Sequence, residues 1–463
     1  MGSMVQGNNQ NYLLLFDAID RMDEYQEQSI KDDFAHLQFV KQLHVAKNYL
    51  LRLIMKSLRG YYLKDSVSAR IKAALTDAEI LFKRDLLKLS YQAIIKAEKL
   101  AVKLGDDLSL LEVLKWKRKL VLNLKDQIIG KKDLDLLNDQ EQEILKNLKN
   151  ESKYWWLTLN IDRQIKAGVD ISQQHPLLQN ENAATTHRAK ILYYHLLYIH
   201  HTMSNRLDLA ESSINNLIEY FEANEFRLKD DPGPYITALN NKIGIYLNQK
   251  KYSQVQTLLQ TIRDLPSKLN LGLKNPISLK IMVRNFNVEL ETYRDSGEYS
   301  LGISMIPRVQ TYIKENLEFI STDYLILLHY QFAYLYFMAG DFSNALQNIN
   351  MVLNYRYQAG RDDIVGYAQF LNLIIHYELG NSTVMKYAVD SSRRYLRKRG
   401  NLLEFEKVLL RLFSKLSTTP NSQHTGLFST IYKKLFDGPA LINASQLDYL
   451  DFKYWLQKKA RVE

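Results

Sequence analysis

One stretch constrains the fold of this chain more than any other: ILLHYQFAYLYFMAGDFSNALQNINMVL, residues 326–353. Small and apolar residues recur in it at helical spacing on both sides of Gly340. Ala333 and Ala345 are small enough to let two helices approach closely, and glycine readily adopts the left-handed backbone conformation that ends many helices. The stretch therefore predicts two helices joined by a tight turn, with larger side chains filling the space between them.

The same spacing returns, in less regular form, along much of the chain. Ile243, Leu290, Ala333 and Leu373 occupy equivalent positions, so successive units are about 40 to 47 residues long. Asp85 replaces the turn glycine in an early copy over residues 66–104, so that turn must be built differently. In the copy around Ile243 the same position is held by Lys250, which predicts a second turn without glycine.

The order of small, aromatic, glycine, aromatic and small residues in 326–353 resembles the tetratricopeptide repeat, whose strict unit is about 34 residues. The longer units of this chain resemble a divergent variant of that superfamily. The resemblance implies an all-α fold: an α-solenoid of antiparallel helix hairpins wound into a right-handed superhelix. Its members commonly act as scaffolds for partner proteins.

The helical patterns and the resemblance together divide the chain into four ranges. Residues 1–5 resemble an expression scar, 6–65 are expected to form an N-terminal helical cap, 66–416 the tetratricopeptide-like repeats, and 417–463 a C-terminal helical cap. Helices are expected, among others, over 39–61, 133–151, 153–167 and 445–458. Polar loops are expected over 168–186, 229–234 and 417–426.

Composition excludes several classes of protein. A hydrophobic share of 46% and a charged share of 24% are those of an ordinary globular protein, and 18 Gly and 8 Pro in 463 residues favour helices. The absence of cysteine excludes disulfides, thiolate metal sites and a cysteine nucleophile. No signal segment follows the first residues, and no apolar run approaches the roughly 20 residues that cross a bilayer. We therefore expect a cytoplasmic protein without membrane insertion.

The net charge of +10 includes two local basic clusters. One surrounds Trp116 and the other surrounds Tyr395. The first contains Lys115, Lys117, Arg118 and Lys119, and the second contains Arg393, Arg394, Arg397, Lys398 and Arg399. Solvated helix faces, or helix C-terminal turns where cations are favoured, explain such clusters most simply. A contact with phosphate groups of a nucleic acid is the alternative.

No local pattern indicates catalysis. The sequence lacks a phosphate-binding G-x-x-x-x-G-K-[ST] loop, a G-x-G-x-x-G turn, an H-E-x-x-H pair and a G-x-S-x-G elbow. Four histidines gather in one region: His187, His195, His200 and His201. His195 and His200 would point about 140° apart on a helix, so they do not suit a common metal ion. We therefore expect no enzyme activity, no cofactor and no metal.

The expected solenoid places the first helix of each unit on a concave face. Its outward side chains there are polar in the earlier units and aromatic in the later ones. They are Thr237, Asn240, Arg284, Asn287, Glu291, Arg294, Tyr330, Tyr334, Phe337, Tyr367, Phe370 and Tyr377. Polar groups can bond a peptide backbone or carboxylate, and aromatic rings can hold an apolar side chain.

These residues predict a groove for a peptide or helix of a partner protein, and hence a protein-interaction scaffold or adaptor. Aromatic residues at helical spacing are also common core residues. The six aromatic residues of this set could therefore belong to the core instead of a groove. Asn240, Arg284 and Asn287 resemble part of the carboxylate clamp of some tetratricopeptide proteins, but its lysines are missing. Two further functions remain: a regulatory peptide sensor coupled to a domain upstream, and nucleic-acid binding through the basic clusters. The sequence does not indicate the oligomeric state.

Overall fold

The computed structural model describes residues 10–22, 25–124, 131–166, 175–272, 275–355, 360–400, 402–437, 442 and 449–461. All regular structure in these ranges is helical, without a β-strand, which confirms the all-α prediction. None of the described helices is long and apolar enough to cross a bilayer. The contacts divide the chain into two compact units, Met1–Ala238 and Leu239–Glu463. Residues 1–5, the predicted scar, lie outside the described ranges.

The first unit begins with a small helical module. It contains α1 (Gln10–Asp20), α2 (Glu27–Asp33), the 3-10 helix η2 (Gln38–Gln42) and α3 (Leu43–Asp65). The apolar residues that α3 buries against α1 and α2 recur at intervals of three and four, as helical packing requires: Leu43, Ala46 and Leu50 meet Leu15 and Ile30. The helix predicted over 39–61 is wrong at its start, because its first residues form η2.

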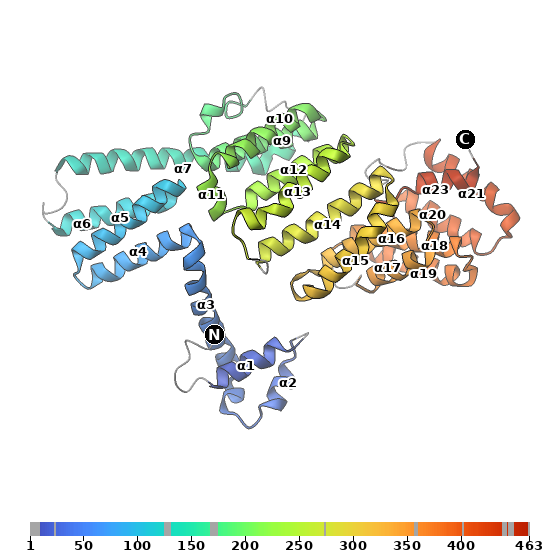
Figure 1. The fold of residues 1–463 in the computed structure, drawn as a ribbon, viewed down its shortest axis with the longest axis horizontal. Helices are drawn as coiled ribbons and strands as arrows, with labels where there is room; N and C mark the ends of the chain where they lie inside the picture. The colour runs from blue at the N-terminus through green and yellow to red at the C-terminus, as the bar shows by residue number, and fades with distance from the viewer. Residues whose placement is uncertain are drawn as a thin grey trace. The chain divides into compact units, whose positions relative to one another are not determined.

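The rest of the first unit is built from helices that pack against their neighbours in sequence (Figure 1). They are α4 (Val67–Lys83), α5 (Leu87–Leu104), α6 (Asp107–Leu124), α7 (Lys131–Lys166), α9 (His187–Met203), α10 (Leu207–Glu222) and α11 (Glu225–Asp230). Asp85, between α4 and α5, has a positive φ of 60°, so the prediction that this turn is built differently is wrong: aspartate takes the same left-handed conformation as the turn glycines. Asp and Asn tolerate this conformation better than other non-glycine residues.

Two predictions about this unit need correction. The helices expected over 133–151 and 153–167 form one continuous helix, α7, because no glycine or proline interrupts the sequence between them. The loop expected over 229–234 starts later, since α11 extends to Asp230. Of the loop expected over 168–186, the described part contains the short 3-10 helix Glu181–Ala183, and residues 168–174 lie outside the described ranges.

The second unit begins within α12 (Gly233–Asn248). Its further helices are α13 (Tyr252–Lys268), α14 (Pro276–Ser296), α15 (Tyr299–Glu315), α16 (Thr322–Met338), α17 (Phe342–Tyr355), α18 (Asp362–Glu378), α19 (Ser382–Arg399), α20 (Glu404–Leu416), α21 (His424–Phe436) and α23 (Phe452–Ala460). Left-handed residues stand between the paired helices: Lys250, Gly297, Gly340 and Gly380. The helix, turn and helix predicted over 326–353 are confirmed as α16 and α17.

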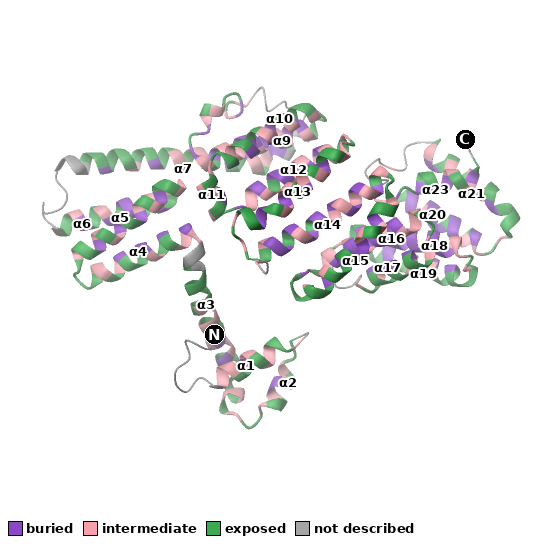
Figure 2. Ribbon diagram, viewed as in Figure 1, coloured by how far each residue is buried: buried purple, intermediate pink, exposed green. Residues whose placement is uncertain are grey.

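Close packing in this unit depends on small side chains. Ala333 and Ala345 are fully buried between α16 and α17, as their size predicts. At Gly302 of α15 an added Cβ would lie 2.9 Å from the methyl carbons of Leu335, so α15 and α16 approach closely because that residue is glycine. Figure 2 shows buried residues concentrated on α16 and α18, the two helices that contribute many of the residues of the hydrophobic core.

The C-terminal end of the second unit differs from the prediction in one place. The polar loop expected over 417–426 is shorter, because α21 begins at His424. The first residues of the helix expected over 445–458 lie outside the described ranges, which resume at Tyr449. The Asp451 side chain accepts a hydrogen bond from the backbone N–H of Tyr454 and caps α23.

Candidate functional site

The structure brings six of the predicted groove residues to one cavity of about 750 Å³ in the second unit, here named the polar cavity. They are Asn240 of α12, Arg284, Asn287, Glu291 and Arg294 of α14, and Tyr330 of α16. The four from α14 recur at intervals of three and four residues, so they share one face of the helix. Thr237 does not line this cavity, and its hydroxyl donates to the Gly233 carbonyl oxygen of its own helix.

Arg294 is the buried charge of the polar cavity, with 8% of its surface exposed. Its Nε donates to Asp295 Oδ1 at 2.7 Å and its Nη1 to Gln331 Oε1 at 3.3 Å, and the guanidinium lies 5.4 Å from the ring centre of Tyr334. Burial disfavours the charge, but the carboxylates of Asp295 and Glu291 outweigh it and raise the pKa of Arg294 above its usual range. Arg294 therefore holds α14 to α16, and its charge is already neutralised.

Arg284 and Asn287, by contrast, have unused hydrogen-bonding capacity. Arg284 is exposed and forms no ion pair or hydrogen bond with any described residue. Asn287, one turn later, has a buried Oδ1 that finds no donor among the described residues. A buried acceptor without a partner is destabilising by about 1–3 kcal/mol, so an N–H donor that reaches Asn287 Oδ1 would be favoured there. The polar cavity thus offers a free cation beside a free amide.

The aromatic part of the predicted groove is occupied by the chain itself. Tyr330 donates its hydroxyl proton to the Tyr449 carbonyl oxygen at 2.7 Å, and the Asp451 N–H donates to the Tyr334 hydroxyl oxygen at 3.2 Å. Both tyrosines are buried, and burial raises the pKa of Tyr334 to about 12. The two hydroxyls therefore bind the backbone of residues 449–451, which requires no particular side chain there.

The later aromatic residues also face the C-terminal segment. The Tyr367 ring stacks on Tyr449 with ring centres 5.0 Å apart, and burial raises its pKa to about 12. Tyr377 meets Trp455 edge to face at 5.8 Å, and the Trp455 Nε1 donates to Glu378 Oε1 at 2.6 Å. These contacts place Tyr367 and Tyr377 against residues 449–460.

Phe337 and Phe370 lie in two different surroundings. Phe337 borders a further cavity of about 1040 Å³, which α14, α16 and α23 also line. Phe370 is buried and packs against Phe405 with ring centres 6.4 Å apart. Phe370 therefore lies in the core, while Phe337 stays half-buried at a cavity wall.

Sequence reasoning missed the far wall of the polar cavity. Arg361, Asp323 and Tyr449 also line it. Arg361 is paired with Asp363 at 2.7 Å, and Asp323 accepts the Gly360 N–H at 3.1 Å. Arg361 lies outside the helical periodicity that located the α14 residues, and Tyr449 is brought in by long-range docking. No local signal in the sequence could have found them.

Most cations of the two basic clusters have partners. Lys115, Arg394 and Arg397 are exposed, and Lys398, also exposed, has an interaction of its own. The others contact an acid or a ring: Lys117 with Glu98 at 2.6 Å, Arg118 with Glu141 at 2.5 Å, Lys119 with the Trp116 ring at 4.5 Å, Arg393 with Asp390 at 3.0 Å and Arg399 with Glu406 at 2.6 Å. Paired cations release fewer counterions from a nucleic acid and attract it less.

We expect Arg399→Ala to destabilise the second unit by about 2–3 kcal/mol. The Glu406 side chain is 3% exposed and depends on Arg399 and the Leu403 N–H, so the substitution leaves a buried carboxylate with half of its partners. Arg397→Ala, in the same helical turn but without an ion pair to any described residue, should change the free energy of unfolding by less than about 0.5 kcal/mol. Urea unfolding measures both; equal losses would contradict a structural role for Arg399.

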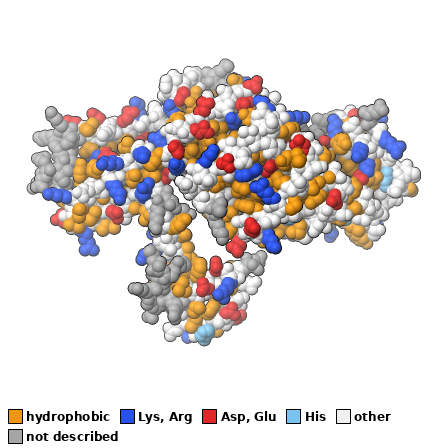
Figure 3. Space-filling view, in the orientation of Figure 1, with side chains coloured by type: hydrophobic (Ala, Val, Ile, Leu, Met, Phe, Trp, Pro, Cys, Tyr) orange, Lys and Arg blue, Asp and Glu red, His pale blue; other side chains and the backbone are white. Residues whose placement is uncertain are grey.

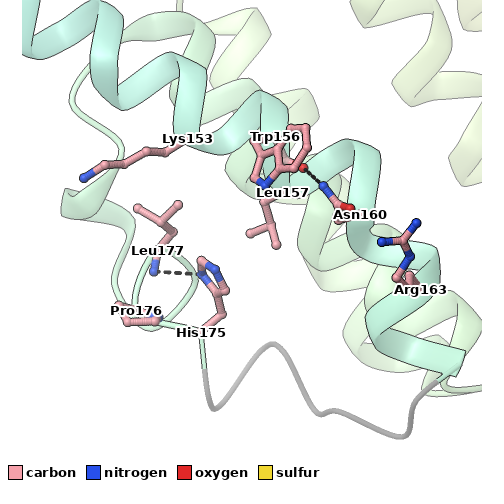
Figure 4. Close-up of a pocket in the computed structure, with 8 residues that line it drawn as sticks. All are labelled: Lys153, Trp156, Leu157, Asn160, Arg163, His175, Pro176 and Leu177. Atoms are coloured by element: carbon pink, nitrogen blue, oxygen red, sulfur yellow. Dashed lines mark hydrogen bonds between the residues drawn. The ribbon is translucent and has the colours of Figure 1, made fainter.

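The first unit contains another cavity, of about 660 Å³, beside α7 (Figure 4). Trp156 and Leu157 of α7 line it together with the segment from His175 to Leu177, and Figure 4 shows the Leu157 side chain extending toward that segment. The Asn160 amide donates to the Trp156 carbonyl oxygen at 2.8 Å. The lining is mostly apolar, and its polar groups do not converge as those of a specific site do. The polar cavity is therefore the stronger candidate.

The described residues contain no group of three or more His, Asp or Glu side chains placed to hold a metal ion. Of the four predicted histidines, His187 contacts the Tyr220 hydroxyl at 2.8 Å, and burial lowers its pKa to about 4. His200 and His201 are buried and meet each other at 5.4 Å between ring centres. The first contact is a hydrogen bond between α9 and α10, and the second lies within α9.

No protein-family description matches the chain, and no curated protein matches it.

Proposed function

We propose that the chain is a divergent, long-unit member of the tetratricopeptide-like superfamily, an α-solenoid of helix hairpins, and that it acts as a protein-interaction scaffold. The partner's peptide segment would bind in the polar cavity of the second unit. Support for the architecture comes from the recurring helix pairs and from the left-handed residues at Lys250, Gly297, Gly340 and Gly380. A solenoid of this kind exposes the first helix of each pair on a concave face.

One observation carries the proposed binding role. Tyr330 and Tyr334 already bind a peptide backbone, that of residues 449–451, and in the cavity that Tyr330 and Tyr449 line, Arg284 and Asn287 Oδ1 have no partner among the described residues. Tyr449 lines the polar cavity and so connects the occupied part to the open part. A partner segment placed there would continue the same mode of backbone binding, with a carboxylate or carbonyl at Arg284 and an N–H at Asn287.

The two alternatives have less support. Nucleic-acid binding through the basic clusters would need free cations, but five of those nine cations contact acids or rings. A regulatory peptide sensor would use the same groove as the scaffold, and no separate observation favours it. The binding experiment below therefore bears on both the scaffold and the sensor.

Arg284→Glu is expected to weaken peptide binding at least about tenfold without lowering the melting temperature. Arg284 is exposed and unpaired, so reversing its charge repels an acidic or carbonyl group of the ligand and breaks no internal contact. The probe is a peptide selected from a displayed random library against the unmodified protein, and fluorescence anisotropy gives its dissociation constant. Arg294→Glu is unsuitable here because it would break the buried pair with Asp295.

Lys386→Glu is the matched control, because it reverses an exposed charge on α19, outside all described cavities. It should leave peptide affinity unchanged. If Arg284→Glu and Lys386→Glu behave alike, or if the library yields no binder at all, the polar cavity is not a peptide site.

A further inference from the structure

Helix α3 carries a row of apolar side chains that no described residue covers. Leu51, Met55 and Leu58 are 56%, 41% and 42% exposed. They are spaced by four and then three residues, the 3.5-residue repeat of a coiled-coil seam. His44 and Asn48, both exposed, continue this spacing toward the start of the helix. Figure 3 shows hydrophobic side chains along α3 at the surface.

The row is distinct from the face by which α3 joins its own module. Leu43, Ala46 and Leu50 are buried on that face with residues of α1 and α2. On an α-helix the middle of the exposed row lies about 120° around the axis from the middle of that buried face. Helix α3 therefore has two apolar faces, and only one of them is used within the described chain.

A band of cations borders the exposed row on one side. Arg52, Lys56 and Arg59 each directly follow a residue of the row, and all three are exposed. Lys56 and Arg59 form no ion pair with any described residue. The helix contains no acidic residue until Asp65, its last position. This surface therefore repels a second copy of itself and attracts acidic side chains.

We propose that the exposed row with its cations, the α3 seam (Leu51, Arg52, Met55, Lys56, Leu58 and Arg59), pairs with an acidic amphipathic helix of a partner protein. The apolar row supplies the contact with the partner's own apolar row, and the cations pair with Asp or Glu at the flanking positions. The row is one side chain wide, which suits a helix, whereas a helix that lies on a bilayer needs a broad apolar face. The proposal does not depend on the polar cavity.

Three probes test the α3 seam: a synthetic helix with Leu at the seam positions and Glu at the flanking positions, the same helix with Lys in place of Glu, and vesicles of phosphatidylcholine and phosphatidylserine. The full chain should bind the Glu helix at least about tenfold more tightly than the Lys helix, and added salt should reduce the difference. Lys56→Glu combined with Arg59→Glu should reverse the preference between the two helices.

Matched variants distinguish binding at the α3 seam from nonspecific hydrophobic or electrostatic binding. Leu51→Ser with Leu58→Ser should abolish binding of the Glu helix, whereas Val45→Ser, an equally exposed apolar residue outside the row, should not change it. Lys96→Glu with Lys99→Glu reverses two exposed charges on α5 and should also have no effect. Equal binding of the two helices, or binding of neither, would overturn the proposal. Vesicle binding that Leu51→Ser and Leu58→Ser remove, with no Glu-helix binding, would assign the seam to anionic lipid instead.

Discussion

Trp455→Ala is expected to lower the free energy of unfolding of the second unit by about 3–5 kcal/mol, because it creates a large cavity where the C-terminal segment docks. Trp455 is 6% exposed and lies between three rings, with centres 5.8 Å from Phe413, 5.2 Å from Phe428 and 5.8 Å from Tyr377. The substitution also removes the Nε1 donor of Glu378. Calorimetry should show the transition of the second unit about 10 °C lower.

The neighbouring Tyr454→Ala is the control, because Tyr454 is 54% exposed and contributes little to this core. It should change the melting temperature by no more than about 2 °C. Hydrogen exchange adds a local measurement: Trp455→Ala should speed exchange along α21 and α23. If the Trp455→Ala variant has the same melting temperature as the unmodified protein, residues 449–460 do not dock as described.

Ala345→Arg is expected to be comparably harmful, with a loss of about 3–5 kcal/mol. Ala345 is fully buried between α16 and α17, so an arginine there must displace neighbouring side chains and place a charge in an apolar core. Gln347→Arg, an exposed position of the same helix, should have nearly no effect. The two variants are compared by urea unfolding. An Ala345→Arg protein as stable as Gln347→Arg would show that α16 and α17 do not pack as described.

Helical periodicity predicted most elements of the fold because it depends on local spacing. The pair α16 and α17 follows directly from Ala333, Gly340 and Ala345. Periodicity failed where a helix boundary depends on a helix-breaking residue. No glycine or proline stands near residue 152, so α7 continues past it. It also could not show that Asp85 and Lys250 would take the left-handed conformation.

That the predicted polar residues share one helical face was predictable, and their surroundings were not. Arg284, Asn287 and Glu291 share one helical face by spacing alone, and the structure places them in one cavity. The docking of residues 449–460 onto α16 and α18 depends on contacts between segments more than 70 residues apart, such as Trp455 with Glu378. The sequence shows that Tyr330 and Tyr334 are aromatic, but not that their hydroxyls bind residues 449–451.

The most direct test of the proposed function is a crystal structure of the chain with a peptide selected for tight binding. We expect the peptide to lie in the polar cavity, with an oxygen within hydrogen-bonding distance of the Arg284 guanidinium and an N–H donated to Asn287 Oδ1. Residues 449–451 should stay bound to Tyr330 and Tyr334. A peptide bound elsewhere, with Arg284 and Asn287 still unpaired, would contradict the proposed groove.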